Sequence, residues 1–175
     1  MTLPQAWMQQ AESDFRTAER VNNPTDARTR CQAIAKYQQC VEKSIKGVLD
    51  KLCAAGLTAQ GSDRGHRVAR YAAVLSGFPA TPDNRALLNQ LRRLFTERVL
   101  DQINLLDSLV PAYPAPGVPA ARNPEYPFQD AAGNWRAPSD VDAFAVGEIK
   151  RLRNCAGLLV RGLRKILDAL DLLYP

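Results

Sequence analysis

The stretch KYQQCVEKSIKGVLDKL, from Lys36 to Leu52, decides the fold class. Apolar residues recur in it at alternating steps of three and four, which is the repeat of an amphipathic α-helix. The same face extends back to Ala27, and Gly56 offers a C-terminal cap. The positions on this face are Ala27, Cys31, Ile34, Gln38, Val41, Ile45, Val48 and Leu52. The stretch therefore predicts one long helix with a single buried face.

Polar residues within this helix need an explanation. Gln38 lies on the apolar face, where an amide without a partner costs about 1–3 kcal/mol. It is expected either to bond Asp14 of a preceding helix or to contact a ligand. Glu42 and Lys46 are four residues apart, in the order that favours an ion pair on a helix surface. Lys43 is either a similar surface residue or a ligand-binding residue.

The rest of the chain also predicts helices, since apolar and polar residues nowhere alternate as in a strand. Asn22-Asn23-Pro24 ends the first helix, and Gly77 and Pro79 end a short one. The expected caps of the other helices are Thr25 or Asp26, Asp83, and Ser139 or Asp140. The predicted ranges are about 3–21, 27–55, 66–75, 83–110 and 139–173. Four long helices and one short helix predict an all-α, up-and-down antiparallel bundle.

Composition is that of one folded domain covering 1–175. The chain is 46% hydrophobic and 23% charged, with a net charge of +5 that weakly favours a polyanionic partner. Four scattered cysteines and a single histidine argue against a zinc site, and no cofactor or other metal is expected. The N-terminus lacks the pattern of an export leader. The longest charge-free run, Ser108 to Ala121, holds four prolines, so no membrane helix is expected and the protein is predicted to be cytoplasmic.

The connection from Pro111 to Pro138 contains seven prolines and is too long for a simple turn between helices. Its aromatic residues are Tyr113, Tyr126, Phe128 and Trp135. They favour folding of the connection back onto the bundle, because exposing all of them would be unfavourable. It either closes one end of the core or forms a binding loop.

The last predicted helix carries a basic face. Lys150, Arg153, Arg161 and Arg164 fall within a sector of about 80° at the α-helical repeat. Such a face could bind phosphates, or it could be an ordinary solvated surface.

The order of several parts of the sequence resembles the HEPN family. These parts are KYQQCVEKSIKGVLDKLCAAG, a loop, Gly65-His66 before a short helix, another long helix, and an Arg-x-x-x-Tyr-Pro turn from Arg122 to Pro127. The likeness is greatest to HEPN proteins encoded beside minimal nucleotidyltransferases. It implies a helical bundle that forms a homodimer and binds such a partner, a nucleotide or RNA. The resemblance, together with the charge of the basic side chains, indicates four candidate ligand-binding residues. They are Arg122, Tyr126, Lys43 and His66.

The ribonuclease motif of that family is absent. Many family RNases carry an arginine, four to six residues and then a histidine, which together could move a proton and stabilise a charged phosphorane. His66 is the only histidine, and Ala59, Gln60 and Gly61 occupy the positions where the arginine would stand. After Arg153, the histidine positions hold Leu158, Leu159 and Val160.

Three functions remain open. The first is a catalytically silent HEPN-like interaction protein. The second is a divergent ribonuclease that uses Arg122 or Arg153 with Tyr126 or His66. The third is a structural bundle whose basic face is incidental.

Overall fold

The computed structural model describes residues 1–23, 25–63, 65–66, 68–79, 81, 84–109, 127–130, 132–138 and 145–175. The helices are α1 (Leu3–Val21), α2 (Ala27–Ala54), α3 (Val68–Ser76), α4 (Arg85–Leu94), α5 (Glu97–Leu109) and α6 (Val146–Leu173). Two short strands, β1 (Phe128–Gln129) and β2 (Trp135–Arg136), pair antiparallel. Apart from this hairpin, the described elements are helical, as the sequence predicts. None of the helices in the described ranges is long and apolar enough to cross a membrane.

The first two helices have the predicted bounds. The backbone N–H of Thr2 donates to the side chain of Gln5, so a capping box starts α1. The side chain of Asp26 accepts the N–H of Arg28 at 2.9 Å and caps α2. Beyond the end of α2, Gly56 has a φ of +70°, a backbone conformation that glycine adopts without strain.

The prediction of one long helix over 83–110 is wrong, because the helix breaks between α4 and α5 at Phe95 and Thr96. The carbonyl of Thr96 accepts the N–H groups of Val99 and Leu100, which starts a new helix. The break lets α4 pack against α6 while α5 packs mainly against α3. A side-chain oxygen of Asp107 also accepts the N–H of Val68 at 2.8 Å. Among the described residues, α4 and α5 therefore stand in place of the single long helix predicted for this part of the chain.

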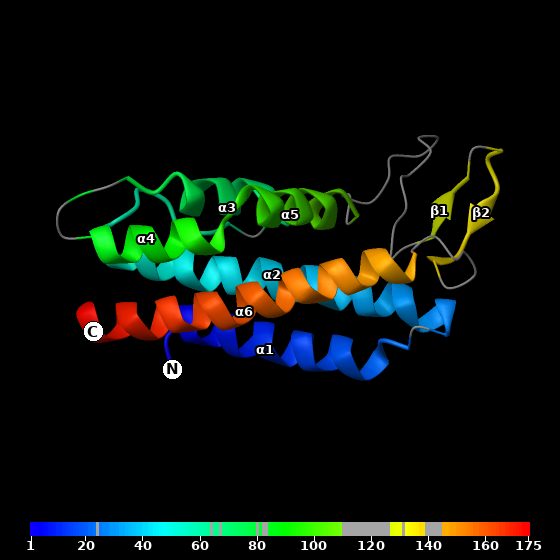
Figure 1. Cartoon of the computed structure of the whole chain (residues 1–175), viewed down its shortest axis with the longest axis horizontal. Coiled ribbons are helices and arrows are strands. Elements are labelled where there is room, and N and C mark those ends of the chain that lie inside the picture. The colour runs from blue at the N-terminus through cyan, green and yellow to red at the C-terminus, as the bar shows by residue number, and fades with distance from the viewer. Residues whose placement is uncertain are drawn as a thin grey trace.

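α2 and α6 form the middle of the molecule (Figure 1). α1 packs against both of them on one side, and α3, α4 and α5 lie on the other side. The helix faces predicted to be apolar supply most of the core. On α1, Met8 and Asp14 are buried, whereas the larger side chains of Trp7 and Phe15 are only partly buried.

Both ends of the chain lie at the same end of the bundle (Figure 1). The side chain of Gln5 donates to Asp171 at 3.1 Å, which links the start of α1 to the end of α6. Leu173 is 69% exposed, because it lies on the last turn of α6, past the last buried residue of the helix, Leu170.

Most of the connection before α6 lies outside the described residues, as do the predicted caps Asp83, Ser139 and Asp140. The predicted start of the last helix near 139 is wrong, because Ala145 is extended and caps a helix that begins at Val146. Asn84 occupies the cap position of α4 without a capping side-chain bond. In the described hairpin, Trp135 is 65% exposed, so this aromatic ring does not fold back into the core as expected.

Candidate functional site

Polar side chains of α2 are buried in the stretch from Lys36 to Leu52. They are Gln38, Glu42, Ser44 and Lys46. Nζ of Lys46 lies 2.7 Å from Oε1 of Glu42, and the two residues are 2% and 4% exposed. The expected surface pair is therefore a buried pair, because α1 and α3 cover this part of α2.

Two aromatic rings enclose the ammonium group of Lys46. It lies 5.3 Å from the ring centre of Trp7 on α1 and 5.6 Å from that of Tyr71 on α3. Trp7 donates its indole N–H to Asp50 at 3.1 Å, and the hydroxyl of Tyr71 donates to Asp63. Burial, and then the carboxylate of Asp63, raise the pKa of Tyr71 to about 12. The cluster therefore joins three helices around one buried cation.

His66 lies at the exposed edge of this cluster. Its Nδ1 is 2.9 Å from Oε2 of Glu42, and 70% of its side chain is exposed. In the neutral ring this contact places the proton on Nδ1 and leaves Nε2 as an acceptor. Gln38 donates to the same oxygen at 3.3 Å. The expected Gln38–Asp14 bond is therefore wrong, because Gln38 bonds a carboxylate of its own helix.

Asp14 contacts two lysines of α2 and not Gln38. Nζ of Lys36 lies 3.3 Å from one carboxylate oxygen, and Nζ of Lys43 contacts the other. Asp14 is 3% exposed, so this carboxylate is buried and its charge is offset by those lysines. The charge of Lys43, a candidate ligand-binding residue, is thus used within the fold.

The outer face of α6 is the most basic surface that the sequence singled out. From residue 150 to 165 the helix carries six cations and no carboxylate. The cations are Lys150, Arg151, Arg153, Arg161, Arg164 and Lys165. Like charges at this density repel one another unless anions lie close by, so the partners of each cation decide what this face can bind.

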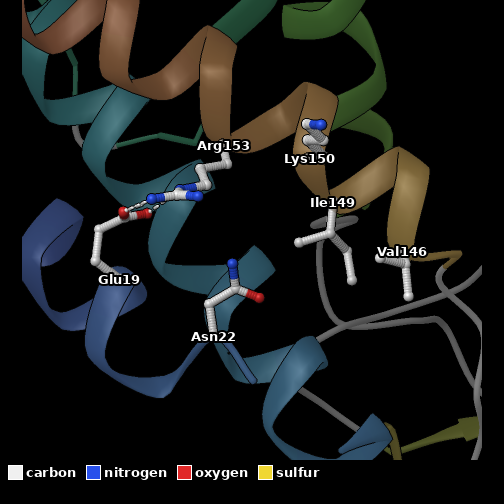
Figure 2. A pocket seen from close by; sticks show the side chains of 6 residues that line it. All are labelled: Glu19, Asn22, Val146, Ile149, Lys150 and Arg153. Atoms are coloured by element: carbon white, nitrogen blue, oxygen red, sulfur yellow. Dashed lines mark hydrogen bonds and ion pairs between the residues drawn. The ribbon is translucent and has the colours of Figure 1, made fainter. Parts of the chain in front are cut away.

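Arg153 is neutralised within the fold. Its Nε lies 2.8 and 2.9 Å from the two carboxylate oxygens of Glu19 on α1, and its Nη2 also contacts that group (Figure 2). The hydroxyl of Tyr37 donates to Glu19 at 2.7 Å. Burial raises the pKa of Glu19, but the hydrogen bonds from Arg153 and Tyr37 outweigh it and the pKa is lowered. Burial, together with this carboxylate, raises the pKa of Tyr37.

Arg164 is also paired, at 3.5 Å from Glu12 and 3.2 Å from Asp168. Lys150 and Arg161 have no carboxylate partner within the described part of the chain. The four cations predicted as one basic face therefore divide into two paired and two unpaired groups.

A hollow of about 440 Å³ lies between α1 and α6 beside the unpaired Arg161. Its wall includes the ring of Phe15, and Arg16 and Lys165 stand at its edge without carboxylate partners among the described residues. Gly157 lets the two helices approach, since an added Cβ there would lie 3.1 Å from the ring of Phe15. The lining residues are Glu12, Phe15, Arg16, Val160, Arg161, Arg164 and Lys165. The hollow thus combines an aromatic wall with unpaired cations.

Two of the candidate residues, Arg122 and Tyr126, lie outside the described residues. Conversely, sequence reasoning missed Arg16 and Lys165. Lys165 was detectable as the neighbour of Arg164 but fell outside the narrow sector considered. Arg16 lies on another helix, and no pattern within α6 could have indicated it.

No protein family, curated protein or solved structure was found to match this chain. Within the described ranges, no group of three or more His, Cys, Asp or Glu residues is placed to hold a metal ion.

Proposed function

We propose that this protein is a non-catalytic, HEPN-like interaction protein that binds the phosphates of RNA or of a nucleotide on the outer face of α6. The observation that carries the proposal is the presence of unpaired cations beside an aromatic-walled hollow. Arg161 and Lys165 of α6 and Arg16 of α1 line this hollow, and Phe15 supplies a ring on which a base could stack.

Electrostatics favours a polyanion as the ligand of this face. Paired groups such as Arg153 gain little from a phosphate, because they already bond a carboxylate of the fold. Unpaired groups such as Arg161 and Lys165 gain a counter-charge and release condensed cations from the nucleic acid. Glu12 also lines the hollow, but its carboxylate contacts Arg164, so Arg16, Arg161 and Lys165 remain for a ligand.

The resemblance to HEPN proteins adds two further parts to the proposal. The protein forms a homodimer, and it binds a minimal nucleotidyltransferase as a partner. Sedimentation equilibrium tests the first part, since a single species of monomer mass at micromolar concentration contradicts it. Co-purification with a nucleotidyltransferase encoded beside its gene tests the second.

RNA binding is tested with a labelled single-stranded RNA and the double variant Arg161→Gln/Lys165→Gln. We expect the wild-type protein to bind the RNA intact and the variant to bind it about tenfold more weakly. The matched control, Arg28→Gln/Arg85→Gln, removes two exposed arginines from α2 and α4 and should keep wild-type affinity. Equal losses in both variants would show that only net charge matters.

A divergent ribonuclease is the second candidate, and the contact between His66 and Glu42 favours it. A carboxylate that fixes an exposed imidazole is an arrangement found at general bases. On this hypothesis RNA is cleaved, and His66→Asn abolishes the cleavage without unfolding the chain. Intact RNA after prolonged incubation with the wild-type protein supports the non-catalytic function instead.

A further inference from the structure

A second basic hollow lies between α5 and α6, on the side of α6 away from the hollow it forms with α1. Thr96, at the break between α4 and α5, also lines this second hollow. Its volume is about 290 Å³, and residues of α5 and α6 form its wall. The lining residues are Thr96, Arg98, Val99, Gln102, Arg151, Asn154, Cys155 and Leu158. No carboxylate lies among them, so the sign of charge in this hollow is uniform.

Two guanidinium groups face this hollow from different helices. Arg98 comes from the first turn of α5 and Arg151 from the first half of α6. Neither makes an ion pair within the described part of the chain, in contrast to Arg153 and Arg164.

The neutral part of the lining indicates the rest of the ligand. Val99 and Cys155 are buried and give the hollow an apolar floor. The amide oxygen of Gln102 is buried and has no hydrogen-bond partner among the described residues. Rotation about the last side-chain torsion of Gln102, which is a soft torsion, would let this oxygen accept a hydroxyl of a ligand.

We infer that the hollow between α5 and α6 is a binding site for a phosphate monoester. A monoester carries up to two negative charges near neutral pH, which match two unpaired guanidinium groups better than a carboxylate or an internal phosphodiester does. The ligand is either a small organic phosphate or the 5′-phosphate at the end of a nucleic acid. This inference does not depend on RNA binding by the α1–α6 side of the helix.

The test uses glycerol 3-phosphate as the probe and backbone amide shifts of the full-length protein as the readout. We expect saturable shifts confined to residues 96–102 and 151–158. Affinity should fall at least tenfold in Arg98→Gln/Arg151→Gln, and also in Asn154→Asp, which adds a negative charge at an exposed position. The control Arg85→Gln/Arg92→Gln, on the exposed face of α4, should bind normally. An unchanged affinity in Arg98→Gln/Arg151→Gln, or no saturable shift, overturns the inference.

A second pair of probes identifies the source of the phosphate. If the natural ligand is a nucleic-acid end, a 5′-phosphorylated oligonucleotide binds more tightly than its 5′-hydroxyl counterpart, and the Arg98→Gln/Arg151→Gln variant loses the difference. Equal binding of the two oligonucleotides, together with binding of glycerol 3-phosphate, assigns the site to small organic phosphates. The variant Arg161→Gln/Lys165→Gln should retain glycerol 3-phosphate binding, so failure at one face is distinguished from failure at the other.

Discussion

Replacing Lys46 with methionine tests how the buried polar cluster contributes to stability. Met keeps an unbranched side chain of similar length but removes the ammonium group that lies 2.7 Å from Glu42. Glu42 is 4% exposed, and after the substitution its charge would keep only the bonds from His66 and Gln38. Breaking a buried ion pair in this way costs about 3–5 kcal/mol. We therefore expect urea unfolding, followed by circular dichroism, to show a loss of that size.

A double-mutant cycle separates the buried charge from the lost packing. Glu42→Gln/Lys46→Met removes both charges of this pair. The double variant should therefore be about 2–3 kcal/mol more stable than the sum of the two single changes predicts. Lys150→Met, at an exposed and unpaired site on α6, is the control and should change stability by less than about 0.5 kcal/mol. A loss under about 1 kcal/mol for Lys46→Met, or strict additivity in the cycle, would refute the argument.

Two further predictions concern helix packing and pH. Gly47→Ala places a Cβ 2.9 Å from the carbonyl oxygen of Pro4 and should destabilise the protein by about 1–3 kcal/mol, whereas Gly147→Ala meets open space and should be neutral or stabilise it by up to about 1 kcal/mol. Denaturant titrations of both variants measure the difference. The lowered pKa of Glu19 means that its pair with Arg153 stabilises the fold above the ordinary carboxyl pKa and stops doing so as pH falls through the lower folded value. Glu19→Gln should therefore cost about 0.2–1 kcal/mol near pH 7, and this cost should shrink as the pH falls below the ordinary carboxyl pKa; a cost that does not change with pH would contradict this assignment.

Helix ranges could be predicted from the sequence wherever periodicity and caps agree. α1 and α2 have both, and their bounds match the prediction. The break at Thr96 could not be predicted, because the apolar spacing through Phe95 and Val99 continues at helical pitch. The break depends on tertiary packing, since α4 packs mainly against α6 and α5 packs mainly against α3.

Partners across helices were harder to predict than the helices themselves. A pattern within α2 indicated that Gln38 needs a partner and that Glu42 can pair with Lys46, but it could not indicate that α1 and α3 bury this pair. Similarly, the spacing along α6 placed Arg153 and Arg161 on one face. Only the positions of the carboxylates on α1 decide that Arg153 is paired.

The salt dependence of RNA binding tests the central claim most directly, because it counts the phosphates that the outer face of α6 contacts. For single-stranded RNA, each contact contributes about 0.7 to the slope of log affinity against log salt concentration. The account predicts that Arg161→Gln/Lys165→Gln lowers the magnitude of this slope by about 1.4, while Arg28→Gln/Arg85→Gln leaves it unchanged. A slope that is the same in the wild-type protein and in Arg161→Gln/Lys165→Gln would contradict the proposal that this face binds RNA.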